Sequence, residues 1–123
     1  MTSLDVNMTG TMLLVTAGNE KSGHLYVLSF DGFFDVVDKL SFGNRPFRVR
    51  RLLNSDYFFV STKTDLHLVH LVKGTLYNVC TLLDVVKDTI ENFVALDHEV
   101  VVTHQQGRAV TVVQFPAVDL DNL

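Results

Sequence analysis

The sequence contains no tryptophan and only one cysteine in its 123 residues. With Cys80 alone an internal disulfide is excluded, which fits a reducing compartment. No uncharged apolar run of about 18 residues is present, so we expect no membrane-spanning helix and no membrane partner. The first residues, MTSLDVNMTG, lack the basic and apolar regions of a secretory signal. We therefore expect an intracellular, cytoplasmic protein, with the nucleus left open as a second location.

Positive charge is also scarce. The formal net charge is -4, which gives no overall attraction to nucleic acid, and we expect no nucleic-acid partner.

His67 and His70 lie three residues apart in an apolar run, so on a strand they face opposite sides and cannot share a metal ion. We expect no metal and no cofactor. We expect Cys80 to act as a small buried hydrophobe rather than as a nucleophile.

Two short motifs recur along the chain in the same order. The first has two large apolar residues, a valine and a hydroxyl residue, and reads LLVT, FFVS and VVVT at 13–16, 58–61 and 100–103. The second is a largely apolar run that reads LYVLSF, LHLVHL and VTVVQF at 25–30, 66–71 and 110–115. Successive copies are 45 and 42 residues apart for the first motif, and 41 and 44 apart for the second. Such paired recurrence indicates an internal repeat.

Each motif predicts a strand, because β-branched and aromatic residues dominate runs of about five to eight residues. Glycine in Asp31-Gly32 and Lys73-Gly74 supplies the positive φ of a tight hairpin before a further apolar run. One unit is thus four antiparallel strands over roughly 42 residues, which is the size of a β-propeller blade. We expect an all-β chain with units at 3–42, 47–83 and 90–115. A helical turn at 84–92 and a single β-sandwich stay open as alternatives.

The second motif resembles the third strand of a WD-repeat propeller blade, and the first motif is similar to its second strand. The signature Trp-Asp pair is absent: Leu28, Val69 and Val113 stand at the Trp position, with Ser29, His70 and Gln114 at the Asp position. The Gly-His pair that precedes a blade is also missing. The resemblance therefore implies degenerate WD-repeat-like blades.

Three units are fewer than the about four to eight blades of natural propellers. The third unit also lacks a clear outer strand, because Pro116 follows its last apolar run. We interpret the chain as a partial propeller, either a fragment of a longer one or part of an assembly. A homodimer would give six blades, a permitted number.

Four arginines cluster in NRPFRVRR at 44–51: Arg45, Arg48, Arg50 and Arg51. In a propeller this run is the innermost strand of the second blade, next to the central channel. Arg48 and Arg50 share one face of that strand, whereas Phe47 and Val49 share the other. The arginines either pair with carboxylates of neighbouring blades, such as Asp5 or Asp35, or bind a phosphate or an acidic peptide.

The function that we predict is a non-enzymatic scaffold for protein partners, with the four arginines as the contact for an acidic partner. The alternative is an enzyme, because GNEKSGHLYVLSFDG at 18–32 is also similar to blades of lactonase-type and YVTN-type propellers. Some of those hydrolyse sugar lactones with acidic and histidine residues at the channel mouth. No comparable set of inward carboxylates is legible in this sequence.

Overall fold

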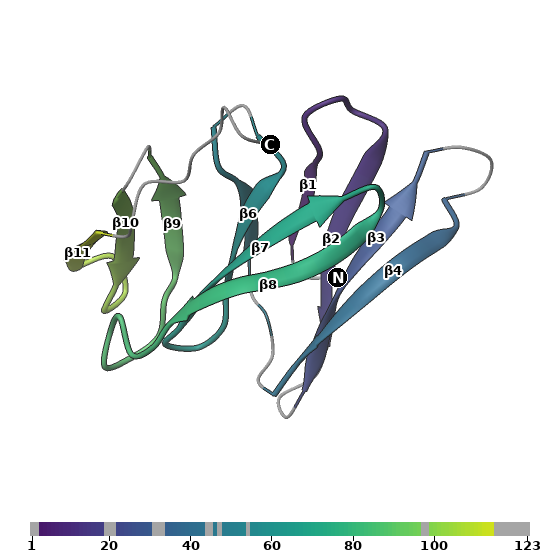
Figure 1. Ribbon diagram of the computed structural model, residues 1–123. Coiled ribbons are helices and arrows are strands. Elements are labelled where there is room, and N and C mark those ends of the chain that lie inside the picture. The colour runs from purple at the N-terminus through teal and green to yellow at the C-terminus, as the bar shows by residue number, and fades with distance from the viewer. Residues whose placement is uncertain are drawn as a thin grey trace.

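The computed structural model describes residues 3–18, 22–30, 34–43, 46, 48–53, 55–96 and 99–114. These residues contain eleven strands and no helix. The strands form three antiparallel sheets that lie side by side, with the second sheet between the first and the third (Figure 1). The prediction of an all-β chain built from four-stranded antiparallel units is confirmed, with three strands described in the third sheet.

The strands of each sheet follow one another in sequence order. The first sheet contains β1 (Ser3–Val6), β2 (Met12–Gly18), β3 (Gly23–Ser29) and β4 (Val36–Phe42). The second contains β5 (Arg48–Arg51), β6 (Tyr57–Ser61), β7 (Leu66–Val72) and β8 (Thr75–Leu82). The third contains β9 (Asn92–Ala95), β10 (Glu99–His104) and β11 (Ala109–Gln114). Each sheet is therefore a meander of neighbouring strands.

The register of the strands reproduces the sequence repeat. In each sheet the hydroxyl residue that ends the first motif lies opposite the first residue of the second motif. The pairs are Thr16 with Leu25, Ser61 with Leu66, and Thr103 with Val110. The same residues also lie opposite the start of the first strand, in the pairs Thr16–Ser3, Ser61–Arg48 and Thr103–Asn92. Equivalent positions in the three sheets can therefore be assigned residue by residue.

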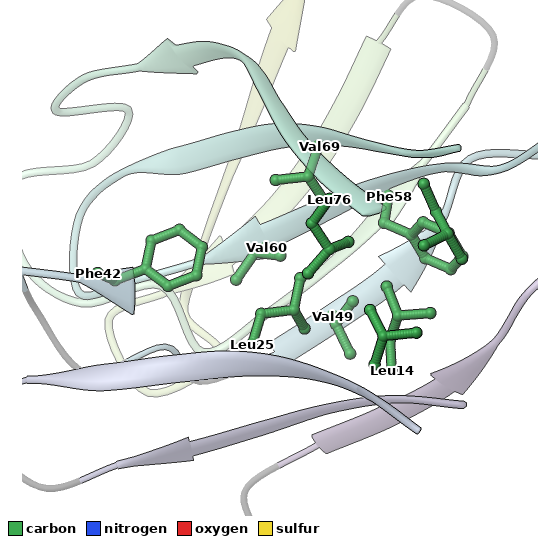
Figure 2. Close-up of a cluster of buried hydrophobic side chains, with 10 residues drawn as sticks. Leu14, Leu25, Phe42, Val49, Phe58, Val60, Val69 and Leu76 are labelled. Atoms are coloured by element: carbon green, nitrogen blue, oxygen red, sulfur yellow. The ribbon is translucent and has the colours of Figure 1, made fainter. Parts of the chain in front are cut away.

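The first and second sheets meet face to face across a sealed apolar cluster (Figure 2). Leu14, Leu25 and Val27 of the first sheet have no exposed surface. Opposite them lie Phe58 and Val60 of the second sheet, which also have no exposed surface. Alternation along each strand sends every second side chain into this layer and its neighbours to the other face.

A second apolar cluster joins the second sheet to the third. Phe59 faces it from β6, while its neighbour Phe58 faces the first sheet. The segment at 83–91 closes one end of this cluster, with Val86 and Ile90 buried against Phe93. This segment contains no helix, so the alternative of a helical turn at 84–92 is wrong. Backbone hydrogen bonds fix it instead, and one of them joins the Ile90 amide to the Lys63 carbonyl at 2.8 Å.

The outer strands of the first two sheets carry bulges at equivalent positions. Val27 pairs with Asp38 and Leu28 with Val36, which leaves Val37 unpaired, and Val79 is skipped in the same way in β8. The Asp38 carboxylate accepts a hydrogen bond from the Leu76 amide at 2.8 Å, so the bulged strand also ties the two sheets together. The predicted turn at Lys73-Gly74 is present, with φ of 51° and 81°. The turn predicted at Asp31-Gly32 lies outside the described residues.

Candidate functional site

The arginine-rich strand β5 lies between the first strands of the two neighbouring sheets. Its alternation is as predicted for Arg48 and Arg50, which share the face toward the third sheet, while Val49 faces the first sheet. Arg51 also points to the first sheet. Arg45 and Phe47 lie outside the described residues. The structure thus brings three of the four arginines together on one central strand.

Two of these arginines bind the start of the third sheet. The Arg48 Nε donates a hydrogen bond to the Glu91 carbonyl oxygen at 3.0 Å. The Arg50 Nη2 donates to Asn92 Oδ1 at 3.0 Å. The Arg50 Nε is buried without a partner among the described residues. Both acceptors are neutral oxygens, so neither interaction neutralises a guanidinium charge.

Arg51 ties β5 to the first sheet. Its Nη1 donates to the Asn7 carbonyl oxygen at 2.8 Å, and its backbone amide donates to Asp5 Oδ2 at 2.7 Å. The Val49 amide adds a third contact, to Ser3 Oγ at 3.3 Å. Asp5 was one of the two carboxylates expected to pair with an arginine. It does bind Arg51, but through the backbone amide rather than the guanidinium.

A histidine network fixes the segment between the second and third sheets. His104 Nδ1 lies 2.9 Å from Asp88 Oδ1, and His104 Nε2 lies 2.8 Å from Thr111 Oγ1. The Gln105 amide donates to the second Asp88 oxygen at 2.7 Å. Desolvation alone would raise the pKa of Asp88, but the hydrogen bonds from Gln105 and His104 outweigh it and lower this pKa below its usual value.

The order carboxylate–imidazole–hydroxyl in this network has the form of a catalytic triad. A polar cavity of about 430 Å³ lies beside it, lined by Asp88, Thr89, Glu91, Gln105, Gln106 and Arg108. His104 is almost completely buried, and neither it nor Thr111 lines this cavity. The hydroxyl therefore has no access to a molecule bound there, and the network acts as a tie between the segment and the third sheet.

His67 and His70 occupy opposite faces of β7, as predicted. His67 packs on Phe42 of the first sheet, with ring centres 4.9 Å apart, whereas His70 stacks on Tyr57 at 4.0 Å. Desolvation lowers the pKa of His67, and the charge of Asp65 opposes this effect. Within the described residues, no group of three or more His, Cys, Asp or Glu side chains lies close enough to hold a metal ion.

Cys80 is half-buried against the second apolar cluster. Desolvation raises the pKa of its thiol, so less of the nucleophilic thiolate is present at neutral pH. This environment is that of a packing residue. The part of the chain that the structure describes includes no helix able to cross a membrane.

Solved structures show the same arrangement of sheets. The β-propeller domain of Myceliophteria thermophila Cps50 (Swd1) superposes with a TM-score of 0.67 at 11% identity, over 94% of this chain and 44% of that one. Kluyvelomyces marxianus Hsv2 superposes with a TM-score of 0.53 at 19% identity, over 94% of this chain and 33% of that one. The chain folds as blades of a β-propeller. The expected β-propeller fold is thereby confirmed.

The matched propellers are much longer than this chain. A variant of KlHsv2 with its loop 6CD replaced by a Gly-Ser linker gives a TM-score of 0.55 at 15% identity, over 94% of this chain and 35% of that one. The chain thus spans between 33% and 44% of the propellers described here. No family model and no curated protein matches the sequence. The three sheets correspond to part of a propeller.

Proposed function

We propose that the chain is a non-enzymatic scaffold that binds an acidic segment of a protein partner. The observation that carries this proposal is the cluster of Arg48, Arg50 and Arg51 on β5, the innermost strand of the central blade. Innermost strands line the channel of a propeller, so these charges lie beside the surface at which a partner segment would enter. The unit is completed by self-association, by further chain or by a partner.

The hydrogen bonds of the arginines support this role. Within the described residues, each guanidinium donates to a neutral oxygen, and the Arg50 Nε has no partner there. A guanidinium has five N–H donors, so donors remain beyond the one that Arg48 or Arg50 uses in the fold. Carboxylate and phosphate groups are the acceptors that fit such a fork. Arg45 belongs to the proposed contact as well.

The proposal is tested with a fluorescent peptide rich in Asp and Glu, whose binding is followed by anisotropy. Arg48→Gln and Arg50→Gln should each weaken binding at least about tenfold, because a charge-assisted hydrogen bond is lost. Affinity should also fall as salt rises. Lys39→Gln is the matched control, because Lys39 is an exposed cation of β4, which is the strand of the first sheet farthest in strand order from β1 and its neighbour β5.

The same variants need a check of the fold, since Arg48 and Arg50 also tie two sheets. Far-UV circular dichroism of each variant should match that of the original chain. Loss of affinity in Lys39→Gln equal to that in Arg50→Gln would show a non-specific charge effect and would refute the site. Absence of saturable binding by the original chain would refute it directly.

A further inference from the structure

Both end sheets leave one face uncovered among the described residues. In the first sheet, Leu14 and Val27 point to the second sheet, so the alternate residues of the same strands point away. They include the aliphatic residues Leu4, Val6, Leu13, Val15 and Leu28, beside Tyr26. In the third sheet, Phe93, Val100 and Val102 point to the second sheet, and the alternate residues again point away. The apolar residues among them are Val94, Leu96, Val101, Val110 and Val112, and the polar residues Asn92, Glu99, Thr103 and Gln114 share this face. We call these sets the β1 face and the β11 face.

The repeat relates the β11 face to surfaces that are buried elsewhere in the chain. Val110 stands at the position of Leu25 and Leu66, because each lies opposite the hydroxyl residue of its own sheet. Leu25 and Leu66 are fully buried, whereas Val110 is 63% exposed. Val112 corresponds in the same way to Val27 and Leu68, both buried. The β11 face is therefore equivalent to two buried faces: the face of the first sheet that packs on the second sheet, and the face of the second sheet that packs on the third.

The β1 face repeats the other half of the interface between neighbouring sheets. Leu4 stands at the position of Val49, and these residues are 50% and 1% exposed, respectively. Leu13 and Val15 correspond to Phe58 and Val60, which are sealed against the first sheet. Leu28 corresponds to the buried Val69. One chain thus carries both halves of a blade-to-blade interface, and the apolar residues of each half are at least partly exposed.

We propose that a second copy of this chain covers these faces, with the β11 face of each copy against the β1 face of the other. The proposal rests on the scaffold proposed above and names what completes it. The contact is head to tail, because the two faces differ, and a twofold axis makes both contacts at once. Two such contacts close a ring of six sheets. That number lies within the about four to eight blades of natural propellers.

The size of the faces favours closure over an open chain of copies. Three strands about 4.8 Å apart, each with about six residues of about 3.3 Å, make a face of about 300 Å². One head-to-tail contact then covers about 600 Å² in total, which is the scale of a crystal-packing contact. Two contacts cover about 1,200 Å², which reaches the lower limit of stable interfaces. The closed dimer is therefore the first stable assembly.

Light scattering behind a sizing column tests the proposal on the full chain. We expect twice the mass of one chain, falling to one mass in Val110→Arg, because a charge without a partner would be buried at the interface. The expected loss in dimer affinity is at least about a hundredfold. Val79→Arg is the matched control, because Val79 is an exposed valine of the outer strand β8 that belongs to neither open face. This control should remain a dimer.

Cross-linking tests the order of the faces. In a Cys80→Ala background, Leu4→Cys and Val94→Cys place one thiol on each face. A short bismaleimide should link the two variants when they are mixed, because the first strands of neighbouring sheets contact each other within the chain. Neither variant should be linked to itself. Self-linking would overturn the head-to-tail arrangement.

Three other results overturn the proposal: a folded monomer, a series of species larger than a dimer, or a Val110→Arg variant that remains dimeric with an unchanged circular dichroism spectrum. Failure here is distinguishable from failure of the proposed function. A monomer that binds the acidic peptide refutes the dimer and leaves the arginine site in place. A dimer that does not bind the peptide refutes the arginine site and leaves the dimer in place.

Discussion

Val27 and Val112 occupy the same position of the repeat in the first and third sheets, but in different surroundings. Val27 has no exposed surface, whereas Val112 is 55% exposed. Replacement of each by alanine removes the same two methyl groups from the third strand of a blade. The change in strand propensity is similar at both positions, so it contributes little to the difference between the two variants. That difference therefore measures burial between blades.

The expected losses follow from this burial. At Val27, two methyl groups at about 0.8 kcal/mol each give about 1.6 kcal/mol. The buried site cannot collapse fully, and the remaining cavity costs at most about a further 1 kcal/mol. Val27→Ala should therefore lose about 1.6–2.6 kcal/mol of unfolding free energy. At Val112 less than half of the side chain is buried and water fills the space, so the loss should be about 0.7 kcal/mol.

Urea unfolding, followed by circular dichroism, measures both losses, and an unchanged denaturant slope shows that the midpoints report stability. The comparison should be made at a protein concentration at which light scattering shows single chains. Equal losses at the two positions would refute the assignment of Val27 to a sealed interface. At higher concentration the loss at Val112 should grow toward that at Val27, because the dimer would bury Val112.

Gly74→Ala should cost more than about 1 kcal/mol in urea unfolding, because Gly74 has a φ of 81° and an added Cβ would lie 2.8 Å from Val37 Cγ1. Gly43→Ala, where an added Cβ meets nothing within 4 Å, should change stability by less than about 0.5 kcal/mol, and an equal cost at both glycines would contradict this. The pKa of His67 is lowered in the folded chain, so as pH falls this histidine is protonated in the unfolded chain before it is protonated in the folded chain. Stability should therefore fall as pH drops below about 6.5. His67→Gln should show a shallower fall of the urea midpoint between about pH 6.5 and 5, and an unchanged slope would refute this role of His67.

The fold could be predicted from the sequence because its signals are local and repeated. Each strand shows its own apolar pattern, and the hydroxyl residues Thr16, Ser61 and Thr103 mark the same position in each sheet. Two independent motifs with nearly equal spacings determine a register as well as a number of units. The bulges at Val37 and Val79 carry no such signal, because a skipped residue depends on the partner strand.

The candidate site was only partly predictable, because its contacts join residues that are far apart in sequence. The alternation of Arg48 and Arg50 follows from the strand itself, but their acceptors, the Glu91 carbonyl and Asn92, lie more than 40 residues away. The network of Asp88 and His104 was missed for the same reason. A backbone carbonyl or a single scattered histidine leaves no mark in a sequence pattern.

Polar contacts separate the internal interfaces from the open faces. Within the chain, the Asp5 carboxylate binds the Arg51 amide, and Arg50 binds Asn92. A sheet placed in the wrong order would leave such groups buried without partners, which costs more than a lost apolar contact. On the open faces, Val6 stands at the position of Arg51 and Val94 at that of Arg50. The internal order is therefore fixed by polar pairs, while valines stand at the positions of Arg50 and Arg51 on the open faces.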